Sequence, residues 1–382
     1  MRASRAVPLL LCLAAVAPLP FSAPAHAETD VEACDRLASN PADPQRPAEA
    51  AGVSREDFDA EEALKTCTRA LAAQPTEPRL HYQAGRAAYV LEDYATARVE
   101  FETAAKAGYK IAAAGMGILY DHGFGLPRDE EKAIDFYKAA ADEIGIASHN
   151  LAIIYRDSAE TPHDYAASMA YFKTAITLGY TDSLHGIGYA YENGFGVPQD
   201  WGKAMHWYRR GAAAGIGDSM NNIGWIYQNG FGVTKDAKVA LDWYQKAVDA
   251  GNPDAVNNIG NLYETGDGVP QDYAKATEWY QKAVDAGNPL AMANIALFLA
   301  TGKGGKTDVP AAVDLFFKSL DAGDAPSDDF NRDYVMEGNW GEPFYTALQE
   351  RLAVAGTYKG KPSGVADDAT RDAITAFSRQ GS

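Results

Sequence analysis

Two histidines stand out as residues that could do chemistry, because they recur at the same position of successive sequence repeats. His149 and His185 are 36 residues apart, and later repeats carry Asn221 and Asn257 at this position. Packed neighbouring helices lie about 10 Å apart, too far for both imidazoles to bind one metal ion. We therefore expect these residues to form a polar ladder on an exposed face rather than a metal site.

Motifs typical of enzymes are also missing from the sequence. It contains no HExxH zinc motif, no GxSxG nucleophile elbow and no phosphate-binding P-loop. Its paired glycines end predicted helices instead of following a strand, so they indicate turns. Acidic residues are too frequent for a general acid–base pair to be singled out. The sequence predicts no catalytic residue, no cofactor and no metal site.

The first 27 residues have the pattern of a secretory signal peptide. Arg2 and Arg5 precede the apolar run Leu9–Val16, and Ala25-His26-Ala27 is a small-x-small cleavage site. We expect cleavage after Ala27 and a periplasmic or secreted mature protein. No other apolar run reaches the roughly 18 residues that a membrane-spanning helix needs, so no membrane span is predicted.

The net charge excludes some classes of binding partner, and the cysteine content predicts one disulfide. The net charge is −18, and loss of Arg2 and Arg5 would make it more negative. With no basic stripe, such a chain is not expected to bind nucleic acid or anionic lipid. In an oxidising compartment, Cys34 and Cys67 are expected to form a disulfide, worth roughly 3–4 kcal/mol in the chain-entropy model. Two buried free thiols are the alternative.

A period of 36 residues organises the middle of the chain. The string WYQKAVDAGNP occurs at Trp243–Pro253 and again at Trp279–Pro289. Three kinds of residue keep this period, with one step of 35: a small residue in a first helix, a glycine pair after it, and an aromatic pair in a second helix. The small residues are Gly117, Ala152, Gly188, Gly224, Gly260 and Ala296. The period predicts stacked helical hairpins, because one hairpin cannot bury its apolar stripe alone.

One repeat shows how the hairpin is encoded. Asn252 can cap the first helix and Pro253 suits its first position, while Gly266 ends that helix and Asp272 can cap the second. A glycine inside a helix is costly, so its expected use is to let the partner helix approach closely. The tryptophans of the aromatic pairs are expected to be core residues: Trp207, Trp243 and Trp279.

These residues resemble the Sel1-like repeat, a relative of the tetratricopeptide repeat. The resemblance is carried by Ile259-Gly260, Tyr263, Gly266-x-Gly268 and Trp279-Tyr280, and by their equivalents one period away. It covers residues 112–325 and implies an all-α, right-handed solenoid. The repeat at 147–180 departs from the pattern, because Ser158-Ala159-Glu160-Thr161 replaces the glycine pair.

The segment before the repeats is expected to contain two parts. Residues 79–111 resemble a plain tetratricopeptide unit. Residues 28–78 are expected to form an N-terminal helical cap that the disulfide ties together. Its helices are predicted over 30–39 and 55–74, with Ser54 and Asp57 capping the second.

A set of polar side chains recurs on the surface of the predicted first helices. In tetratricopeptide-like stacks these helices line a concave groove, so the resemblance implies that the set hydrogen-bonds an extended peptide. The alternative is a solvated face that binds nothing. The set comprises Asn150, His185, Glu192, Asn222, Gln228, Asn258, Glu264 and Asn294.

Residues 335–382 resemble the peptidoglycan-binding-domain-like fold. The positions that match its pattern include Leu348-Gln349, Tyr358, Thr370 and Ala373-Ile374. The resemblance implies a small helical domain that binds peptidoglycan through Gln349, Tyr358 and Thr370. The sequence departs from the pattern in having serine at positions 363 and 378, where the family has aspartate and glutamine.

The Sel1-like resemblance, with the signal-peptide pattern, implies a scaffold or regulatory adaptor of the cell envelope, not an enzyme, that binds an unidentified protein or peptide on its concave face. A peptidoglycan-associated cell-wall protein is the alternative. A β-lactam-binding or β-lactam-hydrolysing enzyme is a third hypothesis. Secreted Sel1-like proteins of that type carry a cysteine pair in nearly every repeat, whereas residues 79–382 contain no cysteine.

Overall fold

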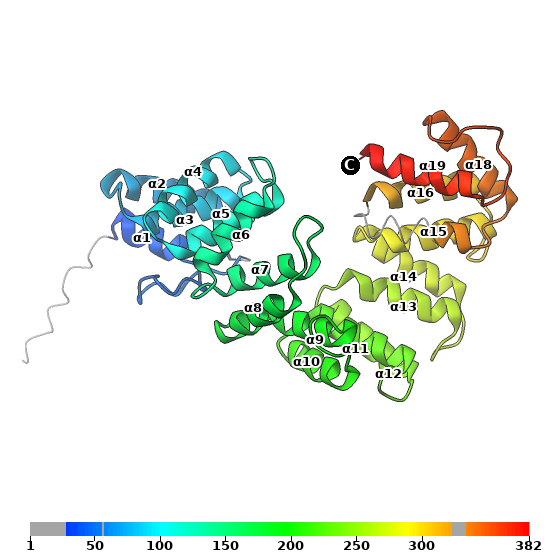
Figure 1. The fold of residues 1–382 in the computed structure, drawn as a ribbon, viewed down its shortest axis with the longest axis horizontal. Coiled ribbons are helices and arrows are strands. Elements are labelled where there is room, and N and C mark those ends of the chain that lie inside the picture. The colour runs from blue at the N-terminus through cyan, green and yellow to red at the C-terminus, as the bar shows by residue number, and fades with distance from the viewer. Residues whose placement is uncertain (1–27, 56, 323–333, 382) are drawn as a thin grey trace, which may run out of the picture. The chain divides into compact units, whose positions relative to one another are not determined.

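The computed structural model describes residues 28–55, 57–322 and 334–381, and every helix or strand assigned in those ranges is an α-helix (Figure 1). The predicted all-α class is therefore confirmed. The chain divides into two compact units, Met1–Tyr109 and Lys110–Ser382. The predicted signal peptide lies outside the described residues.

The first unit joins the predicted cap and the predicted tetratricopeptide unit in one body. Cys34 and Cys67 form the predicted disulfide between its first two helices. The second helix begins at Ala60, because Asp59 caps it by accepting a hydrogen bond from the backbone of Glu62. Its predicted start at residue 55 was wrong. The helices are α1 (Asp30–Ala38), α2 (Ala60–Ala73), α3 (Pro78–Val90) and α4 (Tyr94–Lys106).

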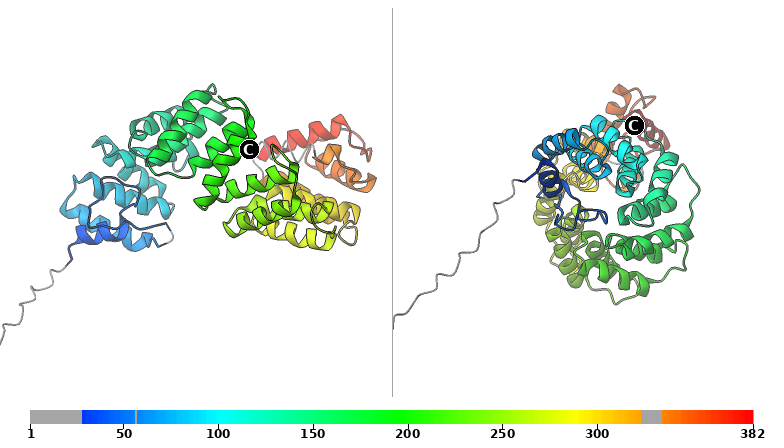
Figure 2. Two further views of the ribbon diagram at one scale, coloured as in Figure 1. Left: turned by 90° about the horizontal axis from the view of Figure 1, so that it is seen from below. Right: turned by 90° about the vertical axis from the view of Figure 1, so that its left-hand side faces the viewer.

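The second unit is a series of helical hairpins, each of which packs against the next (Figure 2). The first helices are α5 (Lys110–His122), α7 (Gly145–Asp157), α9 (Ser183–Asn193), α11 (Gly217–Asn229), α13 (Pro253–Thr265) and α15 (Pro289–Thr301). The second helices are α6 (Glu130–Ala140), α8 (Tyr165–Thr177), α10 (Trp201–Ala213), α12 (Ala237–Asp249), α14 (Tyr273–Asp285) and α16 (Val309–Ala322). Two more helices follow, α18 (Glu342–Val354) and α19 (Asp368–Gly381).

Each regular hairpin is built around a tyrosine ring that lies against a glycine. A Cβ atom added to Gly188 would lie 2.6 Å from the ring of Tyr208, and one added to Gly224 would lie 2.7 Å from the ring of Tyr244. Both tyrosines are fully buried. The predicted role of the helix glycines, close approach of the partner helix, is therefore confirmed.

The tryptophan next to each of these tyrosines is only half-buried. Adjacent helix residues point about 100° apart, so the tyrosine occupies the core and the tryptophan packs at its edge. The placement of the tryptophans inside the core was therefore only partly right. A basic side chain covers each ring at 4.2–4.4 Å: Arg210 over Trp207, Lys246 over Trp243 and Lys282 over Trp279.

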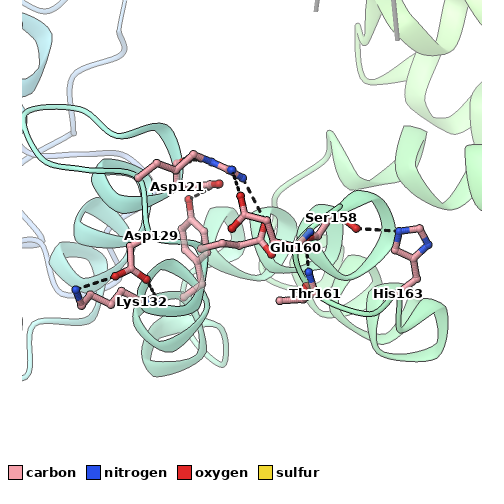
Figure 3. Close-up of polar contacts among 10 residues, drawn as sticks. Asp121, Asp129, Lys132, Ser158, Glu160, Thr161 and His163 are labelled. Atoms are coloured by element: carbon pink, nitrogen blue, oxygen red, sulfur yellow. Dashed lines mark hydrogen bonds and ion pairs between the residues drawn. The ribbon is translucent and has the colours of Figure 1, made fainter. Parts of the chain in front are cut away.

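Polar contacts replace the missing glycine pair in the α7–α8 hairpin (Figure 3). The Ser158 hydroxyl donates to the buried carboxylate of Glu130 at 2.5 Å. The same oxygen accepts from the backbone nitrogens of Glu160 and Thr161 at 3.0 and 2.9 Å. His163 Nε2 lies 2.9 Å from the Ser158 carbonyl oxygen. The hydrogen bonds of the Ser158 side chain thus hold this loop, whereas the other repeats have glycines in the left-handed conformation here.

The C-terminal helices share one hydrophobic core with the last hairpin. Trp340 and Phe344 are fully buried, with ring centroids 4.5 Å apart. Trp340 and Phe344 also contact Phe316 of α16, at 5.8 and 6.1 Å between ring centroids. The segment that was expected to form a separate domain over 335–382 therefore covers the end of the repeat array.

Replacement of Gly224 by alanine is expected to lower the free energy of unfolding by about 1–3 kcal/mol, because the new methyl group overlaps the Tyr244 ring. Gly202 in α10 is the matched control. It is exposed, and Ala274 stands at the same position two repeats later. Gly202→Ala is expected to stabilise by about 0.5–1 kcal/mol. Urea denaturation of both variants measures the difference, and equal effects would contradict the packing role of Gly224.

Candidate interaction site on the first helices

The two helix layers of the central repeats carry opposite charge. The first helices α7, α9, α11 and α13 contain five acidic residues and one basic residue, Arg156. The second helices α8, α10, α12 and α14 contain eight basic and four acidic residues. First helices also contact one another directly, as α9 does α11, which places them on the inner side of the stack. The inner layer is therefore acidic.

The hydroxyl of each core tyrosine is bonded to a residue near the end of the preceding first helix. Tyr208 donates to Glu192 Oε2 at 2.5 Å and accepts from Asn222 Nδ2 at 2.9 Å. Burial raises the pKa of the Glu192 carboxyl above its ordinary value. In the next repeat, Tyr244 donates to Gln228 Oε1 at 2.6 Å, so an amide can fill the same place.

The other predicted contact residues also bond within the array. Asn258 and Asn294 donate to the asparagine one repeat earlier, each at 2.9 Å. Asn150 donates to the hydroxyl of Tyr137 at 3.1 Å, and Glu264 accepts from Tyr280 at 2.7 Å. The structure thus brings these side chains together on the first helices, where they connect helices to one another. Contact with a partner stays a prediction for them.

His185 is the exception in this set. It occupies the position at which Asn221 and Asn257 accept a bond from the next repeat, but Asn222 turns to Tyr208 instead. Nε2 of His185 is buried and has no hydrogen-bond partner within the described part of the chain. Such an atom carries an energetic cost unless a ligand supplies the missing bond.

A cavity of about 450 Å³ lies beside His185, between α7, α9, α11 and the start of α13. The side chains that line the cavity are imidazoles, carboxylates, one guanidinium and apolar groups. The polar and charged members of the lining are His149, Arg156, Asp182, His185, Asp218 and Asn252.

Both histidines are half-buried, so the expectation that they lie on an exposed face was wrong. Burial lowers the pKa of His149 to about 4, with a smaller contribution from the Arg156 charge. Burial likewise lowers the pKa of His185, while the nearby Asp218 opposes this shift. Both imidazoles are therefore neutral at pH 7. Nδ1 of His149 lies 2.8 Å from the Ser183 hydroxyl.

Arg156 marks a change in the tyrosine–acid arrangement at the cavity. It stands where Asp121 and Glu192 stand in neighbouring repeats, and the core tyrosine is replaced here by Phe172. Because Phe172 has no hydroxyl group, the position that Arg156 occupies does not need to supply a hydrogen-bond acceptor. The guanidinium instead lies over the ring of Phe172 at 5.5 Å and over that of Tyr189 at 4.9 Å.

An aromatic patch on the next repeat was missed by the sequence analysis. It consists of Trp201, Trp225 and Phe231, with ring centroids 4.6–6.0 Å apart. Trp225 is 36% exposed. The signal that could have revealed the patch is that these positions are aromatic in this repeat and in the one before it, as Tyr165, Tyr189 and Phe195, whereas one period later they are Ala237, Asn261 and Asp267.

The three residues predicted to bind peptidoglycan are buried in the C-terminal segment. Gln349 Nε2 donates to Thr370 Oγ1 at 2.8 Å, and its Oε1 accepts from the backbone nitrogens of Ser363 and Gly364 at 2.7 and 2.9 Å. Gln349 and Thr370 hold the loop before α19, and Tyr358 packs into the shared core. Peptidoglycan binding by this segment stays a prediction that these contacts do not favour.

The described ranges lack two kinds of feature. None of their helices combines the length and the apolar character needed to cross a bilayer. Their histidine, cysteine, aspartate and glutamate side chains form no group of three or more that could hold a metal ion.

Comparison with known proteins gives one family and a set of solved structures. The Sel1 repeat family model matches six consecutive segments, 110–143, 145–180, 181–216, 217–252, 253–288 and 289–324. A Sel1 repeat protein from Oxalobacter formigenes is 29% identical, with a TM-score of 0.56, over 63% of this chain and 98% of that one. A protective antigen of uropathogenic Escherichia coli with an SLR fold is 24% identical, with a TM-score of 0.53, over 78% and 68%. Comparison with curated proteins gave no match.

Glu192 and Gln228 occupy equivalent positions in neighbouring repeats. Replacing the acid by the amide and replacing the amide by the acid should change the free energy of unfolding in opposite directions. The raised pKa of Glu192 means that its contribution is most favourable below its ordinary pKa of 4.5 and is lost as the pH rises through the folded-state value. Glu192→Gln should therefore stabilise the protein at pH 7, and Gln228→Glu should destabilise it, each by about 1 kcal/mol. Denaturation from pH 4.5 to 7.5 checks this, since both differences should shrink at the acid end. A pH-independent difference would contradict the burial of this carboxylate.

Proposed function

The chain belongs to the Sel1 repeat family, and we propose that it is a scaffold or regulatory adaptor of the bacterial cell envelope that binds a partner protein or peptide on its first helices. Proteins built from Sel1 repeats generally act as scaffolds for protein–protein interaction. No catalytic role is proposed.

The observation that carries the proposal is a break in repeat symmetry. Packing of the hairpins requires a glycine, a tyrosine and small residues at fixed positions, and these recur along the array. It does not require His149, Arg156, His185 or Trp225, which depart from the equivalents in later repeats. The first three line one cavity, and Trp225 belongs to the aromatic patch on the neighbouring first helix.

The composition of this region also suits an interface. Tryptophan, tyrosine and arginine are the residues most enriched among those that dominate binding energy. Tyr189 adds to the aromatic surface beside the cavity, because Arg156 lies over its ring and Phe195 contacts its edge with centroids 5.9 Å apart. The partner is therefore proposed to bind across α7, α9 and α11.

The envelope location is supported by two features of the first unit. The first 27 residues have the pattern of a signal peptide, and the Cys34–Cys67 disulfide is typical of proteins in oxidising compartments. Cleavage after Ala27 would leave Glu28 as the first residue. N-terminal sequencing of the protein purified from the periplasm or the medium tests this proposal directly.

Photo-cross-linking in the source bacterium tests the scaffold proposal. A benzophenone amino acid at position 225 is expected to cross-link one discrete protein, because Trp225 is the exposed member of the aromatic patch. The matched control places the same amino acid at Val354, which is 91% exposed on α18. Mass spectrometry identifies the products. The same set of products from both positions, or none from position 225, would contradict a partner site on the first helices.

A further inference from the structure

We propose that the partner presents a basic segment to the acidic inner layer and that one of its lysine or arginine side chains enters the cavity between Asp182 and Asp218. This inference rests on the proposed function and adds the chemistry of the partner.

The negative charge of the inner layer is the first argument for a basic partner. A partner that lies across α7, α9 and α11 meets the exposed carboxylates of Asp182 and Asp218, with Arg156 as the one lysine or arginine of these helices. Complementary charge increases association rates and excludes partners of the wrong sign. A basic segment is therefore favoured over an acidic one, which the same carboxylates would repel.

One carboxylate of the cavity, that of Asp182, lacks the hydrogen-bond donor that the equivalent carboxylates have in later repeats. Asp218 accepts from Asn252 Nδ2 at 2.6 Å, and Asp254 accepts from Asn288 at 2.8 Å. The equivalent donor position for Asp182 holds Ile216, whose side chain cannot donate. Asp182 is exposed, and the neighbouring Tyr180 hydroxyl is its side-chain contact. A cationic group from a partner can therefore take the place of the missing asparagine.

The remaining groups of the cavity do not oppose a cation. The Arg156 charge is offset because Asp157 binds its Nε and Nη2 at 2.7 and 2.6 Å. His149 and His185 are neutral at pH 7. A neutral imidazole can accept a hydrogen bond, and Nε2 of His185 lacks one. An ammonium or guanidinium group can donate that bond.

The cavity is large enough to admit a long side chain. Ligand pockets typically have volumes of about 300–1,000 Å³, and this one has about 450 Å³. Ile153, Phe172 and Ile216 supply apolar walls along it. Lysine and arginine have an apolar stem and a charged end, so both parts find a matching surface.

A displayed library of random nonapeptides, panned against the full chain, tests the inference. The selected peptides are expected to share a lysine or arginine and a net positive charge. For a selected peptide, calorimetry should show a loss of affinity of about fivefold in Asp182→Asn. Asp254→Asn changes the same repeat position outside the cavity and is expected to have less than a twofold effect. Binding should also weaken as the salt concentration rises.

The outcomes separate this inference from the scaffold proposal. Peptides without a basic residue, or equal affinity for wild type and Asp182→Asn, would overturn the basic anchor. If such peptides still lost affinity in Trp225→Ala, the first helices would remain the binding face. Acidic peptides that depend on Arg156, tested with Arg156→Gln, would overturn the inference in favour of an anion site. Failure to select any peptide would count against both proposals.

Discussion

The contact of a tyrosine ring with a helix glycine, and the bond from the same tyrosine's hydroxyl to the preceding first helix, determine the rest of this architecture. The ring sets how closely the two helices of a hairpin approach. The hydroxyl lets a large aromatic side chain be fully buried while its polar atom stays bonded, as in Tyr208 with Glu192. Because the arrangement recurs each 36 residues, neighbouring hairpins meet at nearly the same geometry and stack into one array.

The period made much of this fold predictable from the sequence. The helices, the glycine turns and the close approach at Gly188 and Gly224 follow from residue types at fixed spacing, while the disulfide follows from one cysteine pair in a chain that begins with a signal-peptide pattern. What a linear pattern could not give is the direction of each side chain within a half-buried face. The bond from Asn258 to Asn221 and the full burial of Gln349 are two such directions, and contact of either residue with a ligand stays a prediction.

The candidate site was the least predictable part for a related reason. A search for what recurs identifies the packing residues, while the cavity is made of departures from the repeat. Arg156 with Phe172, and Ile216 in place of asparagine, are single changes whose meaning depends on which helices they join in space. The array thus combines a uniform packing layer with one place where the side chains are free to differ.

The shared core at the C-terminal end has a consequence for assembly. A hairpin stack that ended at α16 would expose the apolar face that each earlier hairpin offers to its successor. Another molecule could then add its own hairpins there, and repetition of that contact would give an open-ended fibre. Trp340, Phe344 and Leu348 occupy this face within the same chain, so growth of a fibre from this end is blocked.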